Sequence, residues 1–341
     1  MIRLIFMGTP EFAVPSLEAV LAVGDVAAVV TRPDAPQGRG RRVTPPPVAA
    51  VASQYGLEVL QPASLKAPEH LARLRELKPD LVVVVAFGRI VPPEVLAVAP
   101  MGGINLHPSL LPRYRGAAPI PRAIAAGDTE TGVTILYLSQ ELDAGDIILQ
   151  RAVPIRPDDT TATLEPRLAR LGAALLVEAL GLLEAGRAPR RPQDPAGVTI
   201  APKLSREEAR LRWTDPAVTL ANLVRALDPW PVAYTEVAGA PLKIWRAAAL
   251  AEGGREAPGT VVRAGDEGLV VATGAGRLLI LEVQPPSGRR MTAAEYLRGH
   301  PIAPGTVLGA PPPDPTVERN ANPAAGPPGA AKIRGVPRAG R

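Results

Sequence analysis

The sequence predicts an α/β protein in which a Rossmann-like, doubly wound parallel sheet is followed by a smaller OB-like β-barrel domain. In the first 150 residues, apolar runs typical of buried strands alternate with segments whose apolar residues recur at helical spacing. Beyond residue 205 the apolar runs become short and are separated by glycines and charged turns, which favours a small barrel. The chain has 341 residues, enough for two domains of ordinary size.

The expected elements of the first domain alternate between strand and helix. Residues 81–87 contain four consecutive valines, a pattern typical of a parallel strand that is buried on both faces. The helix at 12–23 ends at Gly24, and the helix at 68–77 ends before Pro79, because glycine and proline stop helices. We expect strands at 2–7, 26–31, 81–87, 132–139 and 147–151, and helices at 12–23, 45–55, 68–77 and 160–185.

Changes in composition divide the rest of the chain. Residues 187–204 are polar and proline-rich, which is typical of a linker. Residues 310–341 hold 8 Pro, 4 Gly and 7 Ala without periodicity, so we expect a disordered tail. The predicted division is therefore a first domain at 1–186, a linker at 187–204, a second domain at 205–309 and the tail. In the second domain we expect a helix at 216–227 and strands at 233–237, 242–245, 259–262, 269–272, 278–283 and 306–308.

The composition also limits the classes of function. Cysteine is absent, which rules out disulfides, thiolate nucleophiles and Cys-ligated zinc, and with only three histidines we expect no metal. No apolar run reaches the ~18 residues of a membrane span, and the apolar stretch after Arg3 stops at residues 9–11. We therefore expect no signal peptide, no membrane partner and a cytoplasmic location. The net charge of +5 is concentrated in the tail, so it is a weak argument for a nucleic-acid partner.

The turn after the first strand argues against a dinucleotide cofactor. A dinucleotide fold requires G-x-G-x-x-G at this turn, so that the backbone can approach a pyrophosphate. The chain reads GTPEFA from Gly8, with Pro10 and Ala13 in place of the second and third glycines. No P-loop motif and no G-x-S-x-G motif occurs anywhere in the chain. Nicotinamide and flavin dinucleotides are disfavoured despite the Rossmann-like order of elements.

The segment GGINLHPSLLPRYRG, residues 102–116, carries the most chemistry. Asn105 and His107 are two residues apart, so in an extended chain they point to the same face. A neutral imidazole can accept a proton, and an amide can donate to a developing oxyanion. Asp143 follows a predicted strand and could return to the same crevice, where we expect its carboxylate to raise the pKa of His107 and keep the ring charged. The trio suits acyl transfer to an amine without a covalent intermediate.

Structural interpretations of these segments remain open at this point. Residues 105–108 are compatible with a turn capped by its own side chains, and residues 143–146 with an ordinary turn. The arginines between residues 32 and 42 share one glycine- and proline-rich loop, which fits a solvated loop as well as a phosphate-binding one. The joint position of the first two segments at strand ends favours a functional site.

These residues also resemble a known family. The run NLHPSLLPRYRGAAPI, residues 105–120, is similar to the signature of the folate-dependent formyltransferases and is long enough to be specific. The resemblance covers roughly residues 1–309. Further matching segments are MGTPEF (7–12), the loop at 33–42, GVT (132–134), LDAGD (142–146), APKLS (201–205), PWP (229–231), LKIW (242–245) and PGTVLG (304–309).

The resemblance implies transfer of a formyl group from 10-formyltetrahydrofolate to the α-amino group of methionine on initiator tRNA, by a protein that we expect to be a monomer. It implies that Asn105 stabilises a tetrahedral oxyanion, that His107 moves protons between the attacking amine and the departing folate nitrogen, and that Asp143 tunes His107. The second domain would resemble an OB-fold that guides the tRNA. Folate contacts are expected from Phe87, Gly88, Arg89, Ser109, Leu110, Leu111 and Pro112, and tRNA contacts from Arg39, Arg41 and Arg42.

Other functions stay open on the sequence alone. Formyltransferases that act on an amino sugar nucleotide share the trio and have a small second domain, whereas those acting on glycinamide ribonucleotide lack that domain. The cluster GRGRR at 38–42 favours a polyphosphate chain such as tRNA over a sugar nucleotide. A non-catalytic RNA-binding module is a hypothesis from another class, and the intact trio argues against it.

Overall fold

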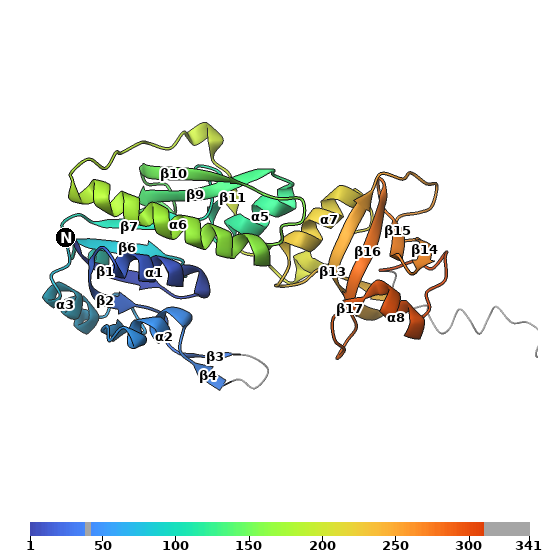
Figure 1. Cartoon of the computed structure of the whole chain (residues 1–341), viewed down its shortest axis with the longest axis horizontal. Helices are drawn as coiled ribbons and strands as arrows, with labels where there is room; N and C mark the ends of the chain where they lie inside the picture. The colour runs from blue at the N-terminus through green and yellow to red at the C-terminus, as the bar shows by residue number, and fades with distance from the viewer. Residues whose placement is uncertain (38–41, 310–341) are drawn as a thin grey trace, which may run out of the picture.

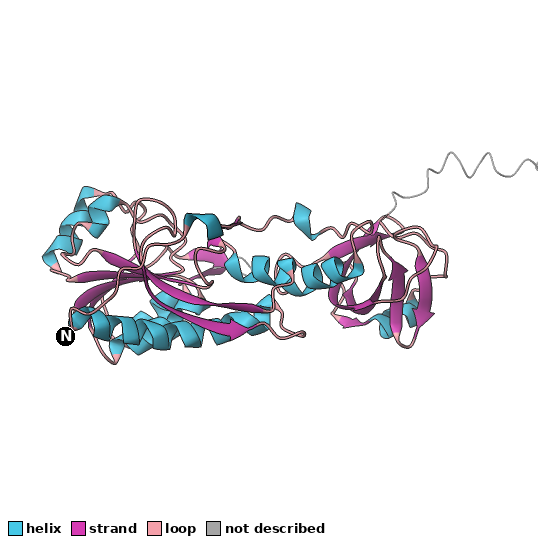
Figure 2. Cartoon of the chain, turned by 90° about the horizontal axis from the view of Figure 1, so that it is seen from above, coloured by secondary structure: helices cyan, strands magenta, loops and turns pink. Residues whose placement is uncertain are grey.

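A computed structural model describes residues 1–37 and 42–309 of the chain (Figure 1). The tail expected at 310–341 lies outside the described residues. An α/β part and a β-rich part follow one another along the long axis of the molecule, and Figure 2 shows the same two parts from above. Within the described ranges, no helix combines the length and the hydrophobicity that a membrane span requires.

One seven-stranded sheet forms the centre of the first part. Its strands are β1 (Arg3–Gly8), β2 (Asp25–Val30), β5 (Val59–Leu60), β6 (Leu81–Val85), β7 (Gly103–His107), β9 (Glu130–Tyr137) and β10 (Ile147–Pro154). Their order across the sheet is β10-β9-β7-β6-β1-β2-β5.

The direction of the strands changes at one edge of this sheet. Strands β5, β2, β1, β6 and β7 run parallel, as expected, and their connections include helices. Strand β9 is antiparallel to β7, and β10 is antiparallel to β9, so the predominantly parallel sheet that the sequence predicts has an antiparallel edge. A parallel neighbour needs a crossover connection, usually a helix, that returns the chain to the starting end of the sheet. Only a loop connects β9 to β10, so these two strands run in opposite directions.

Helices cover both faces of the sheet. Alternate residues of β1 show the division, because Leu4 and Phe6 pack on one face and Ile5 and Met7 on the other. This burial on both faces is the reason why the strands read as continuous apolar runs. The first face carries α1 (Val14–Leu21), α2 (Pro47–Gln54), α5 (Pro119–Ala126) and α6 (Thr161–Glu184), and the second carries α3 (Pro68–Glu76) and α4 (Pro93–Leu96).

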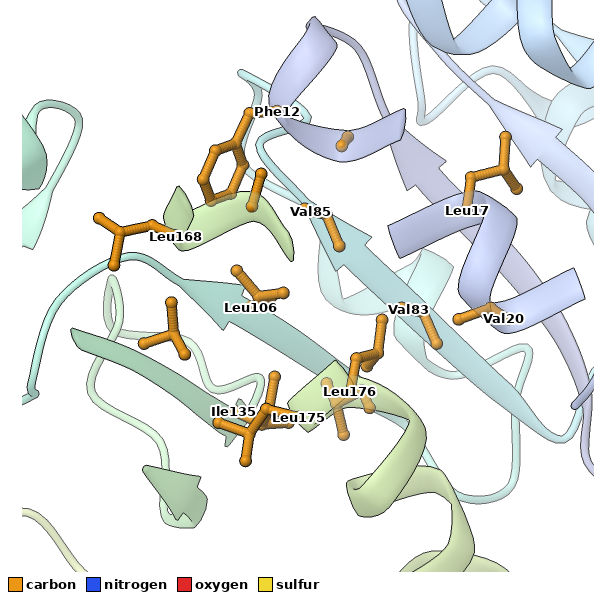
Figure 3. Close-up of a cluster of buried hydrophobic side chains, with 14 of the residues drawn as sticks. Phe12, Leu17, Val20, Val83, Val85, Leu106, Ile135, Leu168, Leu175 and Leu176 are labelled. Carbon is orange, nitrogen blue, oxygen red and sulfur yellow. The ribbon is translucent and has the colours of Figure 1, made fainter. Parts of the chain in front are cut away.

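The longest helix, α6, lies across the centre of the first face. Leu168, Leu175 and Leu176 of this helix are buried over the strands that carry Leu106 and Ile135 (Figure 3). Burial of a leucine side chain contributes about 1.5–3 kcal/mol. The helix therefore stabilises β7 and β9 through the sheet face opposite to the one that α4 covers.

The second part is a curved antiparallel sheet with two helices. Its strand order is β12-β13-β16-β15-β14, with β17 added to β16. The residues 305–309 connect the two edges, because Leu308 N donates to Gly259 O at 2.9 Å and Gly309 N to Glu236 O at 2.8 Å. The elements are α7 (Ala217–Ala226), β12 (Tyr234–Val237), β13 (Ala240–Leu250), β14 (Val261–Gly265), β15 (Gly268–Ala272), β16 (Arg277–Gln284), β17 (Met291–Thr292) and α8 (Ala293–Gly299).

Two expected elements differ from the structure. The strand expected at 306–308 is a single bridge between Thr260 and Val307, because the closing segment is too short to form a ladder. The helix expected at 12–23 begins with a 3-10 turn, η1 (Glu11–Ala13), and continues as α1. Short elements that the sequence did not indicate are β3 (Ala35–Gln37), β4 (Arg42–Thr44), β8 (Arg115–Gly116), β11 (Ile200–Ala201), η2 (Pro195–Gly197) and η3 (Glu207–Ala209), besides α4, α5, α8, β5 and β17.

Two glycines of α6 provide a matched test of how tightly this helix packs on β7. A Cβ at Gly172 would lie 2.6 Å from Cδ1 of Leu106, whereas a Cβ at Gly181 would meet nothing within 4 Å. Gly181→Ala should raise the free energy of unfolding by about 0.5–1 kcal/mol, because alanine is the better helix former. Gly172→Ala should instead lower it, because overpacking a filled core costs about 1–3 kcal/mol. Chemical denaturation measures both; equal stabilisation by the two variants would contradict this packing.

Candidate active site

A cleft of about 470 Å³ opens on the α4 face of the sheet. Its walls come from the loop after β6, the end of β7, and the loop that follows β9. The lining includes the apolar side chains of Val84, Leu96 and Leu138, and the polar side chains of Asn105 and His107. A volume of this size is ordinary for a small-molecule site. The lining residues are 84, 86–91, 96, 105–108, 116, 117, 119 and 138–143.

The alternation of β7 brings Asn105 and His107 into this cleft. Ile104 and Leu106 pack into the core on the α6 face. Because successive strand residues point to opposite faces, Asn105 and His107 project from the other face, where the cleft lies. The same five-residue strand thus supplies both a core surface and a polar surface.

Three groups in the cleft lie next to the carboxylate of Asp143: two hydrogen-bond donors and one imidazole nitrogen. Asn105 Nδ2 donates to Asp143 Oδ1 at 3.3 Å, and the backbone N–H of Gly116 donates to Oδ2 at 2.9 Å. Nδ1 of His107 lies 3.5 Å from the same Oδ2. The side chains of His107 and Asp143 are only 5% and 8% exposed. The structure therefore places the three residues singled out in the sequence next to one another.

The loop that carries Asp143 turns sharply before it enters β10. Asp143 has a φ of 54°, in the left-handed region that non-glycine residues rarely occupy. A Cβ at Gly145 would lie 1.8 Å from the carbonyl oxygen of Tyr137, so only glycine fits there. This tight turn folds the loop back over the sheet face and toward Asn105.

The hydrogen bonds of His107 indicate which ring nitrogen carries a proton. Nε2 lies 2.8 Å from the carbonyl oxygen of Tyr114. A carbonyl can only accept, so Nε2 carries the hydrogen and donates it. In the neutral ring, Nδ1 is therefore the atom with the free lone pair, and it faces Asp143. A proton that arrived at Nδ1 would be stabilised by that carboxylate.

Burial decides the charge of His107. The loss of water around the ring lowers the pKa of His107 below its usual value, and this effect outweighs the opposite influence of Asp143 and of the Tyr114 carbonyl. The carboxylate does act to raise the pKa of His107, as expected, but the expectation that it keeps the ring charged is wrong, because burial outweighs it. The sequence shows the neighbouring charge but not the depth of burial, and here burial is the larger cause. The ring is neutral near pH 7 and can accept a proton.

The residues expected to contact folate fall into two groups. Phe87, Gly88 and Arg89 line the cleft, and Nη1 of Arg89 donates to the carbonyls of residues 62 and 63, at 3.1 Å each. The described residues that line the cleft do not include Ser109, Leu110, Leu111 or Pro112. The hydroxyl of Ser109 donates to the Arg113 carbonyl at 2.6 Å, and Leu111 packs with Leu136 and Ile147.

The expected tRNA-binding arginines lie mostly beyond what the structure describes. Arg39 and Arg41 are outside the described residues, and of Arg42 only the backbone is described, as the first residue of β4. Strands β3 and β4 pair from Ala35↔Thr44 to Gln37↔Arg42. The base of the arginine loop is therefore a short antiparallel ladder.

Several site features escape sequence reasoning. The Tyr114 carbonyl and the Gly116 N–H are backbone groups, and a sequence does not show where a backbone group points. Gly116 has a φ of 119°, and a Cβ there would lie 2.8 Å from the Ala201 carbonyl oxygen, so its glycine identity was the available signal. Ile90 and Leu142, which line the cleft, are 81% and 59% exposed, and only the structure reveals that these two apolar side chains lie at the same cleft.

Known proteins resemble this chain in sequence and in fold. A curated methionyl-tRNA formyltransferase from Moorella thermoacetica is 52% identical over 308 residues, which cover 90% of this chain and 99% of that protein. The N-formyltransferase from Helicobacter canadensis, solved with folinic acid and dTDP-3-aminofucose, has a TM-score of 0.63 at 19% identity and covers 85% of this chain and 100% of its own. HypX from Aquifex aeolicus, solved with tetrahydrofolic acid, has a TM-score of 0.58 at 23% identity, over 87% of this chain and 47% of its own. These two structures show a shared fold.

The family matches follow the two parts of the structure. The formyl transferase model matches residues 2–180, which hold the seven-stranded sheet and the cleft. The formyl transferase C-terminal domain model matches residues 203–301, which hold most of the curved antiparallel sheet. With more than half of its length matched by the first model alone, the chain belongs to the formyl transferase family.

Proposed function

We propose that this protein transfers the formyl group of 10-formyltetrahydrofolate to the α-amino group of methionine on initiator tRNA. The observation that carries the proposal is the convergence of a neutral, buried imidazole and an amide on one carboxylate, at the wall of a cleft. The named relative that is 52% identical over 90% of the chain supports methionyl-tRNA as the acceptor. We propose a direct transfer without a covalent enzyme intermediate, in which the cleft supplies a base and an oxyanion donor and the incoming amine is the nucleophile; cysteine is absent from the chain.

The cleft suits the folate co-substrate. The apolar side chains of Val84, Leu96 and Leu138 in the lining suit the faces of a flat ring system, and backbone groups of residues 86–91 can recognise its polar edge. The exposed side chains of Ile90 and Leu142 offer apolar surface for the remainder of such a molecule. We propose that Phe87, Gly88 and Arg89 contact folate. The contribution of residues 109–112 to folate binding remains a prediction.

The three polar side chains divide the chemistry among them. As the amine attacks the formyl carbon, a carbon–nitrogen bond forms and an oxyanion develops; one amide hydrogen of Asn105 is engaged with Asp143, and the second is available to that oxyanion. Nδ1 of His107 takes the proton that the amine loses and returns it to the folate nitrogen as its bond to the formyl carbon breaks. Asp143 stabilises the imidazolium between these two transfers.

The acceptor is proposed to bind across both parts of the protein. We assign the chemistry to residues 1–186, the linking role to 187–204 and tRNA guidance to 205–309. The second part has 12 Lys and Arg against 11 Asp and Glu, so its contribution must come from the arrangement of charges and not from an excess. Arg39, Arg41 and Arg42 are proposed to hold the acceptor end. The cytoplasmic location and the monomeric state remain predictions.

Transfer to an amino sugar nucleotide and RNA binding without catalysis are not favoured. The solved formyltransferase with a bound amino sugar nucleotide is only 19% identical and supports the shared fold alone. Formylation assays with charged initiator tRNA, charged elongator tRNA and an amino sugar nucleotide in parallel test the acceptor directly. Preferential formylation of the initiator tRNA is the expected result, and a better rate with the sugar nucleotide would overturn the assignment.

The catalytic roles predict large losses of turnover without loss of folate binding. His107→Ala should lower kcat by ~10²–10⁴-fold, the usual contribution of a proton shuttle. Asn105→Ala should lower kcat by ~10²–10³-fold, the usual contribution of one oxyanion donor. Steady-state kinetics with Met-tRNA measure both, and calorimetry with a non-transferable folate analogue checks that binding persists. An Asn105 variant that changed only the Michaelis constant would make this residue a binding group instead.

The burial of His107 predicts the midpoint and the tautomer of its titration. The pKa is lowered, so the neutral ring should persist below pH 6.5, and activity that needs it should be lost only at still lower pH. The chain has three histidines, so NMR spectra of the imidazole nitrogens can be assigned by comparison with His107→Gln. The expected result is a midpoint below 6.5 and a hydrogen on Nε2. A midpoint above 6.5 would contradict the dominance of burial.

The arginine loop predicts a defect confined to tRNA. Arg39→Ala should raise the Michaelis constant for Met-tRNA by about 10-fold, because a charged hydrogen bond to phosphate is lost, while the affinity for the folate analogue stays unchanged. The defect should be larger for tRNAs with a strong first base pair. Arg170→Ala is the matched control, since Arg170 is an exposed arginine of α6, on the face opposite to the cleft. Equal kinetic constants for the two variants would show that the loop does not bind the tRNA.

A further inference from the structure

A buried glutamine of the linker contacts the loop that carries Asp143. Gln193 is 9% exposed, and its Nε2 donates to the carbonyl oxygens of Asp143 and Gly145 at 2.7 and 2.9 Å. Its Oε1 accepts from Nε and Nη2 of Arg115 at 3.0 and 2.9 Å. A single side chain, fifty positions away in the chain, thus satisfies two carbonyls of this loop.

The partners of Gln193 determine which way its amide points. Carbonyl oxygens only accept and a guanidinium only donates, so the NH₂ group must face the loop and the oxygen must face Arg115. Arg115 is 8% exposed and also donates from Nη1 to Glu141 at 3.1 Å. A glutamate at this position would bring a carboxylate oxygen against two carbonyl oxygens, which repel it. The site therefore requires an amide.

The Asp143 loop needs an external anchor. Asp143 itself has a φ of 54°, which is sparsely populated and persists only where the surroundings impose it. The backbone hydrogen bond within the loop, from Ala144 N to Glu141 O, is long at 3.4 Å. The two shorter bonds from Gln193 hold the backbone at Asp143 and Gly145, on both sides of Ala144. The Gly116 N–H holds the carboxylate itself at 2.9 Å.

The linker is fixed on both sides of Gln193. Arg191 and Ile147 exchange two backbone hydrogen bonds, at 2.8 and 3.1 Å. Farther along, β11 pairs in parallel with β8, which contains Arg115 and Gly116. The segment between the two parts is thus attached to the first part at two places, and Gln193 lies between them.

We propose that Gln193 is a positioning residue for formyl transfer: oriented by Arg115, it holds the Asp143 loop so that the carboxylate stays against Asn105 and His107. This proposal rests on the proposed function, which places Asp143 at the reaction. Gln193 lies between the two family matches, which end at residue 180 and resume at residue 203. A residue of the connecting segment, outside both matched regions, therefore shapes the active site.

The first test compares three variants in the full-length protein. Gln193→Ala and the isosteric Gln193→Glu should each lower kcat by about 10- to 100-fold, because a displacement of about 1 Å at a catalytic group has an effect of this size. The Michaelis constants for Met-tRNA and 10-formyltetrahydrofolate should change by less than about threefold. Asp194→Ala is the control, because Asp194 is the exposed neighbour that caps η2 and should leave kcat at the wild-type value. A loss of thermal stability with unchanged kcat would overturn the proposal.

A double-mutant cycle tests whether Gln193 acts through Asp143. If it does, Gln193→Ala should cause no further loss of kcat in an Asp143→Ala background, because residues that act as a unit are not additive. Multiplied losses would show that Gln193 acts by another route and would overturn the proposal. The cycle is informative even where Gln193→Ala lowers stability, because Gln193→Ala is present both in the single variant and in the double variant that are compared.

A spectroscopic measurement separates this proposal from the acceptor assignment. In Gln193→Ala, the NMR titration midpoint of His107 should move from the wild-type value toward that of Asp143→Asn, because the carboxylate no longer keeps its place beside Nδ1. An unmoved midpoint would overturn the positioning role even if the wild type formylates Met-tRNA. A wild type that fails to formylate Met-tRNA would overturn the proposed function, whereas a moved midpoint would still support the role of Gln193.

Discussion

The carboxylate of Asp143 joins parts of the chain that are far apart in sequence. Asn105 and His107 come from a strand, Gly116 from the segment after it, and the carboxylate from a loop beyond the next strand. A charged group with little exposure is costly unless hydrogen-bond donors or a cation surround it. The backbone N–H of Gly116 and the amide of Asn105 supply this environment in the resting state. When Nδ1 of His107 is protonated, the ring adds a positive charge beside the carboxylate. The buried carboxylate then stabilises the charged ring.

Stability and chemistry are built on the same strand. Leu106 lies between the two polar residues of β7 and is buried against α6, where Gly172 permits a close approach of the helix. The depth of this packing holds the strand rigid, and a rigid strand keeps Asn105 and His107 in fixed positions relative to the loop. On the opposite face of the strand, burial at the cleft removes water from His107 and lowers its pKa. A single strand therefore carries a core residue on one face and two polar residues of the cleft on the other.

The segment after β7 also connects the site to the second part. Residues 115 and 116 pair with the linker, and α5 follows directly. Arg122 of α5 donates to Glu208 at 2.5 and 3.1 Å and to the Pro202 carbonyl at 3.1 Å. The position of the second part thus depends on the stretch of chain that also supplies a donor to Asp143. This arrangement suits the proposed acceptor, which would contact both parts while its reactive end enters the cleft.

The sequence by itself determined the class of fold and the pairing of Asn105 with His107, because both depend on local periodicity: continuous apolar runs mark buried strands, and a spacing of two marks one strand face. It also indicated Asp143, through its place after a strand and the resemblance of its surroundings. Only the tertiary structure decided the reversal of β9 and β10, the closure of the second sheet by residues 305–309, and the anchoring of the Asp143 loop by Gln193. It likewise decided the charge of His107, since a pKa depends on the balance between burial and a neighbouring charge 36 positions away. These features arise from contacts between distant residues, and such contacts leave no periodic trace in the order of amino acids.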